Sequence, residues 1–128
     1  MAYTVEVERR FRARQGLTAA VRSVLAPGED VPVLLRIGVD FEDAQLTGRG
    51  WFFDTDVAGD LLDKCCAELA GAVWTSLFPF RPTFELVARD LYERLAAGIP
   101  QLAFVELRDE AFGTVTRYHR PVDVGESP

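Results

Sequence analysis

Two long stretches of alternating residues constrain the fold of this chain more than any other feature. The first, residues 3–11, alternates polar positions with apolar or aromatic ones, namely Tyr3, Val5, Val7 and Phe11. The second, residues 31–41, places a full apolar set on one face: Val31, Val33, Leu35, Ile37, Val39 and Phe41. A period of two predicts strands with one buried face. A polar bend at residues 42–43 then leads to a further extended stretch, predicted over residues 45–53.

The apolar period then changes to that of a helix. Asp54, Thr55 or Asp56 is suited to cap a first helix, whose predicted apolar stripe is Val57, Leu61, Leu62, Cys65 and Leu69. The proline-containing segment 78–82 interrupts it, and Thr83 caps a second helix. The apolar face of that helix is Phe84, Val87, Ala88, Leu91 and Leu95. A shorter stretch, residues 17–25, predicts a short helix or a turn-rich connection.

Two further strands are predicted over residues 102–107 and 114–119, with a turn near Gly113. The order strand-strand-helix-helix-strand-strand predicts an α+β domain, in which two helices pack on one face of a four-stranded antiparallel sheet. We expect one domain over residues 1–121 and a flexible tail over 122–128. A sheet of this kind has unpaired edges. We therefore predict that several copies join their edges into a closed β-barrel ring, a homo-oligomer such as a hexamer.

Composition excludes several classes of partner. The formal net charge of −6 argues against nucleic acid, which binds clustered basic residues. No apolar run approaches the roughly 20 residues that cross a bilayer, so no membrane partner is expected. Since no signal peptide is visible at the start of the sequence, we expect a cytoplasmic location.

Cys65 and Cys66 are predicted to be reduced thiols, with Cys65 in the core and Cys66 turned aside.

Four short motifs lie on these elements in a fixed order. They are Phe11-Arg12-Ala13-Arg14-Gln15-Gly16-Leu17, Gly50-Trp51-Phe52-Phe53-Asp54, Pro82-Thr83-Phe84-Glu85-Leu86-Val87-Ala88 and Val105-Glu106-Leu107. Together they resemble the motifs of the 6-pyruvoyl- and 6-carboxytetrahydropterin synthase family, whose members have the tunnelling fold. The resemblance covers nearly the whole predicted domain, and it implies the same fold here.

The resemblance also shows what this chain lacks. The family holds zinc with three histidines, whose positions correspond here to Gln15, Glu29 and Val31. Its proton-relay pair corresponds to Val73 and Trp74, and its catalytic cysteine has no counterpart in residues 18–30. Zinc requires imidazole, thiolate or carboxylate ligands in a tetrahedral set. We therefore expect a divergent member with no metal, no cofactor and no ordinary tetrahydropterin synthase activity. The only histidine of the sequence, His119, is predicted to be a surface residue.

The family's pterin-anchoring glutamate corresponds to Glu106, so the resemblance implies a ligand-binding carboxylate there. An ionised carboxylate also makes strong hydrogen bonds to paired N–H groups. The alternative is a strand glutamate paired with an arginine. The predicted ligand-binding residues are Glu106, Thr83, Gln15 and Trp74, and the predicted catalytic acid/base residues are Glu106 and Glu29. Helix capping alone also explains Thr83.

Two functions remain open from the sequence. The first is a zinc-independent lyase, isomerase or cyclase that acts on a small heterocycle or specialised metabolite at a subunit interface. The second is a non-catalytic pseudoenzyme that binds a pterin-like ligand or serves as a structural subunit of a ring. A pocket rich in unexplained polar groups favours the first, and a dry pocket filled by aromatic rings favours the second.

Overall fold

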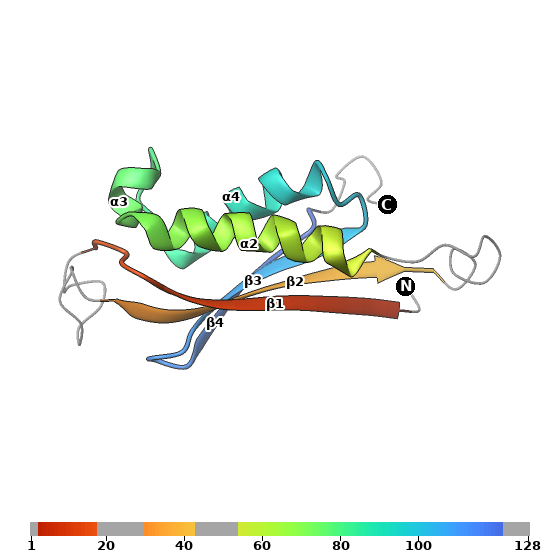
Figure 1. Cartoon of the computed structure of the whole chain (residues 1–128), viewed down its shortest axis with the longest axis horizontal. Coiled ribbons are helices and arrows are strands. Elements are labelled where there is room, and N and C mark those ends of the chain that lie inside the picture. The colour runs from red at the N-terminus through yellow and green to blue at the C-terminus, as the bar shows by residue number, and fades with distance from the viewer. Residues whose placement is uncertain (1–2, 18–29, 43–53, 122–128) are drawn as a thin grey trace, which may run out of the picture.

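Four strands and three helices make up the described part of the chain, residues 3–17, 30–42 and 54–121 of a computed structural model. Strands β1 (Tyr3–Ala13) and β2 (Val31–Phe41) precede helices α2 (Thr55–Gly71), α3 (Trp74–Leu77) and α4 (Phe84–Ala96). Strands β3 (Leu102–Asp109) and β4 (Thr114–His119) complete the domain (Figure 1). The predicted α+β order is confirmed, with the single turn of α3 added. Residues 18–25, 45–53 and 122–128, for which structure was predicted, lie outside the described residues.

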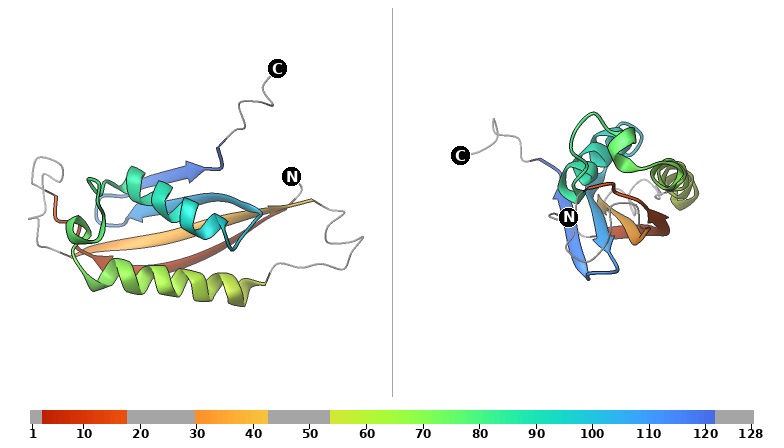
Figure 2. Two further views of the ribbon diagram at one scale, coloured as in Figure 1. Left: turned by 90° about the horizontal axis from the view of Figure 1, so that it is seen from above. Right: turned by 90° about the vertical axis from the view of Figure 1, so that its left-hand side faces the viewer.

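The strands form one antiparallel sheet in the order β1-β2-β3-β4. β1 pairs with β2 along its whole length, from Tyr3 opposite Phe41 to Ala13 opposite Val31. The two long helices lie on the same face of this sheet, and the other face carries none of the described helices (Figure 2). β1 and β4 are the end strands of the sheet. The layer arrangement predicted from the order of elements is therefore confirmed.

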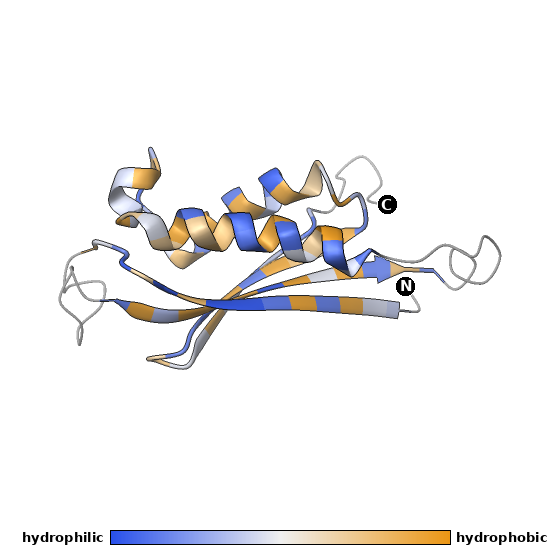
Figure 3. Ribbon diagram, viewed as in Figure 1, coloured by the Kyte–Doolittle hydropathy of each residue, from blue (hydrophilic) through white to orange (hydrophobic). Residues whose placement is uncertain are grey.

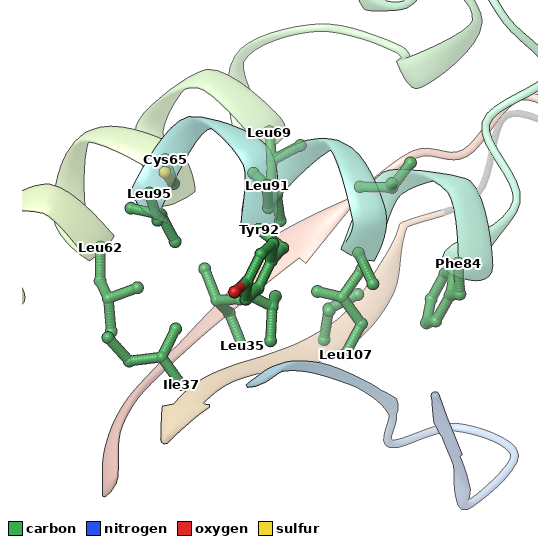
Figure 4. Packing of buried hydrophobic residues seen from close by; sticks show 14 of the residues in the cluster. Leu35, Ile37, Leu62, Cys65, Leu69, Phe84, Leu91, Tyr92, Leu95 and Leu107 are labelled. Carbon is green, nitrogen blue, oxygen red and sulfur yellow. The ribbon is translucent and has the colours of Figure 1, made fainter. Parts of the chain in front are cut away.

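The period of two gives the sheet an apolar face beneath the helices and an opposite face that carries most of its charged side chains together with Leu34 and Phe104. Hydropathy alternates along β1 in Figure 3. On β2 the helix-side residues are almost completely buried: Val31, Val33, Leu35, Ile37, Val39 and Phe41. They pack against apolar side chains of the two long helices and of β3 (Figure 4), including Leu62, Leu69, Leu91, Leu95 and Leu107. Burial of this surface is the main term that stabilises the domain.

The helix boundaries follow from capping side chains. Oδ1 of Asp54 accepts hydrogen bonds from the backbone N–H groups of Asp56 and Val57, which selects Asp54 among the three predicted caps. Oγ1 of Thr83 accepts from the backbone N–H of Leu86 at 3.3 Å and caps α4 as predicted. Both caps satisfy N–H groups that have no partner within the helix.

One part of the predicted α2 stripe is wrong. Val57 is 52% exposed, and Ala58 is buried in its place. The buried positions of α2 are Ala58, Gly59, Leu62, Cys65 and Leu69. The four of these that carry a side chain are spaced by four, three and four residues, as one helix face requires. Val57 lies in the first turn of α2. The direction of the helix axis decides which side chain of this turn faces the sheet, and an apolar side chain can still point away from it. No helix in the described ranges is long and apolar enough to span a bilayer.

The two cysteines differ in burial, as predicted. Cys65 is buried in the core and Cys66 is half-buried. Burial, and then the neighbouring Cys65, raise the pKa of Cys66 from about 9 to about 11, and burial also raises the pKa of Cys65. Only a thiolate reacts readily with disulfide reagents.

Both thiols are therefore expected to react slowly in the native protein. At about pH 8, Cys66 should react with Ellman's reagent roughly 100-fold more slowly than the same thiol in the denatured chain. The rates can be followed by absorbance with and without denaturant. Equal rates in the two states would contradict the burial of these side chains.

Candidate functional site

The chain after β1 crosses closely beneath α3. Gly16 has a φ of 81°, and a Cβ atom there would lie 2.5 Å from Val73 and 2.6 Å from the hydroxyl of Thr75. The backbone N–H of Trp74 donates to the carbonyl of Arg14 at 2.9 Å. A residue with a side chain would collide at Gly16 and would be strained by its positive φ. The crossing therefore requires glycine and fixes the direction of the neighbouring Gln15.

Gln15 is a buried polar side chain with only part of its hydrogen-bonding capacity used. Its exposed fraction is 6%, and its Nε2 donates to the carbonyl of Pro82 at 2.9 Å. Its Oε1 is buried and has no hydrogen-bond partner among the residues that the structure describes. An unpaired buried acceptor costs about 1–3 kcal/mol, so native proteins rarely keep one without a reason. Oε1 of Gln15 therefore keeps an acceptor capacity that none of the described residues uses.

A hollow of about 350 Å³ lies beside Gln15, between the start of α4 and the β3–β4 hairpin. Its lining residues are Gln15, Thr83, Phe84, Glu85, Asp109, Thr114 and Thr116. Gln15, Phe84 and Asp109 are buried, whereas Glu85 and Thr114 are exposed. The hollow thus combines a buried floor of polar and aromatic groups with a polar rim that solvent reaches.

Asp109 supplies the buried carboxylate of this hollow. It is 2% exposed and ends β3, opposite Thr114 of β4. Its Oδ1 accepts hydrogen bonds from the backbone N–H groups of Ala111 and Phe112 at 3.0 and 3.1 Å. These bonds shape the hairpin turn, in which Gly113 adopts a φ of 75°. This turn places Thr114, the first residue of β4, opposite Asp109.

The lining chemistry favours ligands that donate hydrogen bonds. Among the described residues the hollow contains two carboxylates, an amide and three hydroxyl groups, and none of its lining residues is basic. Carboxylates accept hydrogen bonds but do not donate them when ionised. Anionic ligands would therefore be repelled, while neutral or cationic ligands with several N–H groups would find matching acceptors.

The structure separates the residues that the sequence predicted as one site. Gln15 and Thr83 line the hollow together. Glu106 does not line it, and Glu29 lies outside the described residues. Trp74 is completely buried and donates its Nε1–H to the carbonyl of Leu69 at 2.9 Å. Its ring contacts Phe84 at a centroid distance of 5.5 Å, so it supports the hollow only through that phenylalanine.

Glu106 belongs to the opposite, helix-free face of the sheet. Its side chain is 1% exposed, and Oε1 accepts from Nη2 of Arg117 at 2.6 Å. Oε2 accepts from Arg36 at 3.2 Å and lies 3.5 Å from Arg108. This geometry is that of the alternative given above, a strand glutamate paired with arginine, except that the side chain of Glu106 is also buried. The carboxylate is already surrounded by guanidinium groups of its own chain.

Asp109, Glu85, Thr114 and Thr116 were not predicted from the sequence. The sequence did contain an indication of Asp109, because residues two apart on a strand share a face. Asp109 therefore lies on the same face of β3 as Val105 and Leu107, which point into the core. Glu106 has the other parity. A carboxylate that ends the apolar side of a strand is the pattern that points to the hollow.

The described residues do not fit a zinc ion. At the positions that correspond to the family's ligands, Gln15 offers an amide whose nitrogen already donates to Pro82, and Val31 is a core side chain without a donor atom. His119 lies on the helix-free face, opposite Phe104. Within the described ranges no three side chains of the types His, Cys, Asp or Glu gather as a metal site would require.

The sequence matches no family model and no curated protein significantly. The fold, however, matches solved structures. The structure of 6-pyruvoyl tetrahydropterin synthase from Caenorhabditis elegans superposes with a TM-score of 0.65 at 13% identity, over 93% of this chain and 96% of that chain. At this identity the likeness concerns the fold alone, and it agrees with the resemblance that the motifs predicted. This chain therefore has the fold of 6-pyruvoyl tetrahydropterin synthase, at low sequence identity to it.

Proposed function

We propose that this protein binds a small, donor-rich heterocycle in the hollow at Gln15, Thr83 and Asp109, and converts it without zinc as a lyase, isomerase or cyclase. The observation that carries the proposal is the buried Oε1 of Gln15, which has no partner among the described residues, beside a hollow that is also lined by the buried residue Asp109. A planar ring with adjacent N–H groups, as in pterins and guanine, would donate to both acceptors. We propose that the protein acts in the cytoplasm.

In this proposal Asp109 has the anchoring role that the sequence assigned to Glu106. Two further carboxylates are candidates for proton transfer. Glu85 is exposed at the rim of the hollow, where a proton can exchange with water. Glu29 also stays a proposed acid/base residue, because it precedes β2, whose first residue Val31 pairs with the end of β1 near Gln15. A general acid or base must lie within hydrogen-bond reach of the reacting atom.

The hollow lies beside a sheet edge, which supports a site at a subunit interface. Thr114 and Thr116 belong to β4, an end strand of the sheet. A second copy added at this edge would cover the open side of the hollow and exclude water. The proposed assembly is a ring of copies whose sheets join into a barrel.

A non-catalytic role is the second candidate, and one observation favours it. The positions that correspond to the family's proton relay are Val73 and Trp74, and the indole N–H of Trp74 is used by the Leu69 carbonyl. Neither group can transfer a proton. Under this alternative the same hollow binds a pterin-like ligand without converting it.

The experiment is a calorimetric titration of chelator-treated protein with 2-amino-4-oxopteridine and with guanine. Asp109→Asn keeps a side-chain oxygen for the turn but removes the charge, so affinity should fall roughly 10- to 100-fold. Glu110→Gln, one residue further and exposed, is the matched control and should bind like wild type. Equal affinity of the Asp109 variant and wild type would exclude this hollow. Mass spectrometry of the incubated ligand then separates conversion from binding alone.

A further inference from the structure

A second hollow, of about 340 Å³, lies on the helix-free face of the sheet. It is placed where β3 begins and β4 ends, whereas the hollow at Asp109 lies at the other end of β3. The described residues that line it are Thr4, Asp40, Ala103, Phe104, Arg117, His119 and Arg120. We call it the bipolar hollow, because its described basic residues come from β4 and the residue after it, and its described acidic residue comes from β2.

The basic side of the bipolar hollow contains a guanidinium group that is fixed in place. Phe104 lies over Gly38, where a Cβ atom would overlap its ring. Arg117 lies over this ring in turn, with Cζ 4.0 Å from the ring centroid, which is a cation–π contact. Its Nε and Nη2 donate to Oε1 of Glu106 at 3.1 and 2.6 Å. Nη1 of Arg117 has no partner among the described residues, so one N–H group is left over at a fixed position.

Arg120 is the second fixed guanidinium group of the bipolar hollow. Its Nε and Nη2 donate to the carbonyl of Leu102 at 3.0 and 2.7 Å, and Nη2 also donates to the carbonyl of Pro100 at 3.4 Å. No carboxylate of the described residues pairs with Arg120 or with the exposed His119 next to it. In a chain with a net charge of −6, a guanidinium without a counter-charge matches an anion from outside the chain.

The acidic side of the bipolar hollow is formed by Asp40, opposite Thr4 of β1. The hydroxyl group of Thr4 donates to Oδ1 of Asp40 at 2.6 Å. Asp40 is half-buried, and within the described ranges no cation pairs with it. Its Oδ2 therefore keeps an acceptor capacity that none of the described residues uses.

The two sides lie two strand spacings apart, because β2 and β4 flank β3. Two spacings are about 10 Å, and side chains of both strands extend into the space between them. From this arrangement we propose that the bipolar hollow binds a small zwitterion. Its phosphate or carboxylate group contacts Arg117, His119 and Arg120, and its ammonium group contacts Asp40. This site is separate from the proposed function, since the two hollows share none of their lining residues.

The charges on the two sides limit the ligand to molecules that carry both signs. A simple anion is attracted by Arg120 but repelled by Asp40, and a simple cation meets the opposite combination. A molecule with an anionic and a cationic end makes charge-assisted hydrogen bonds on both sides. The short distance between the sides favours a ligand in which a few bonds separate the two charged groups.

The test follows the ring protons of His119 by NMR, because it is the only histidine of the sequence and its signals need no separate assignment. O-phosphoethanolamine and β-alanine carry an ammonium group two carbons from a phosphate or a carboxylate group, and both should shift these signals saturably. Tighter binding of one probe identifies the anionic group. Ethyl phosphate lacks the ammonium group and should bind about tenfold more weakly than O-phosphoethanolamine.

Two variants test the two sides separately. Asp40→Asn keeps an oxygen for Thr4, and it should weaken O-phosphoethanolamine about tenfold while ethyl phosphate binds no more weakly than before. Arg120→Gln should weaken both ligands about tenfold. Asp60→Asn and Arg89→Gln make the same charge changes at exposed helix positions and should bind like wild type. Circular dichroism verifies that each variant is folded, and the conservative Asp40 variant serves if Arg120→Gln is not.

Two results would overturn the proposal. One is that millimolar concentrations of both zwitterions leave the His119 signals of the wild-type protein unchanged. The other is that folded Asp40→Asn binds O-phosphoethanolamine as tightly as wild type. Neither result would affect the pteridine titration of the Asp109 variant, so failure of the bipolar hollow and failure of the proposed function remain distinguishable.

Discussion

Replacing Glu106 by alanine is expected to lower the free energy of unfolding by about 3 kcal/mol, because it removes the buried carboxylate that pairs with three partly exposed guanidinium groups. The side chain of Glu106 is 1% exposed and that of Arg36 is 19% exposed. This loss lies at the low end of the range for breaking a buried ion pair. Arg108 and Arg117 are each more than a third exposed, so water screens their charges. Urea unfolding followed by tryptophan fluorescence measures the change.

The control is Glu110→Ala. Glu110 pairs with Arg10 at 3.2 Å on the surface, where an ion pair contributes about 0–1 kcal/mol. A loss at Glu106 no larger than at Glu110 would contradict the buried network. The pair of variants also separates two roles of Glu106, because a structural carboxylate lowers stability while the folded fraction keeps its affinity for pteridine.

Replacing Trp74 by alanine is expected to cost about 3–5 kcal/mol, the range for removal of a large buried aromatic side chain. Trp74 is completely buried, contacts Phe78 and Phe84, and holds the Leu69 carbonyl through its indole N–H. Trp74→Phe keeps a ring and loses that hydrogen bond, so it should cost about 1–2 kcal/mol. Thermal and urea unfolding, followed by circular dichroism, measure both.

Leu86→Ala is the control for Trp74, because Leu86 is 38% exposed on α4 and its loss should cost well under about 1 kcal/mol. The folded Trp74→Phe protein should bind pteridine like wild type, since the ring lies behind Phe84. A selective loss of affinity without loss of stability would instead support the direct ligand contact that the sequence predicted for Trp74.

Most of the fold could be predicted from the sequence because the strand pattern, the helix pattern and the helix caps agree with one another. Alternation predicted the strands, and the caps at Asp54 and Thr83 predicted where the two long helices begin. The helix that starts after Thr83 was predicted with five of its six buried residues, and the one that was missed is Tyr92. Val57 was misassigned because one apolar residue in the first turn fits a helical pattern whether or not it faces the sheet.

The candidate site was harder to predict, because it depends on how strands align. β3 is apolar at most positions, so its sequence alone does not show which face the helices cover. Burial of Glu106 arises from Arg36 and Arg117, which only the pairing of β3 with β2 and β4 brings to it. The hollow likewise joins Gln15, Thr83 and Asp109 from three distant segments. Motif spacing identified the first two, whereas Asp109 lies outside the four motifs and its position on the apolar side of β3 was not used.

A crystal structure of the chelator-treated protein with 2-amino-4-oxopteridine would test the proposed ligand site most directly. We predict that the pteridine ring lies in the hollow beside Phe84, with its N–H groups donating to Oε1 of Gln15 and to the carboxylate of Asp109. A ligand bound instead on the helix-free face against Glu106, or a ligand that binds only after zinc is added, would contradict it.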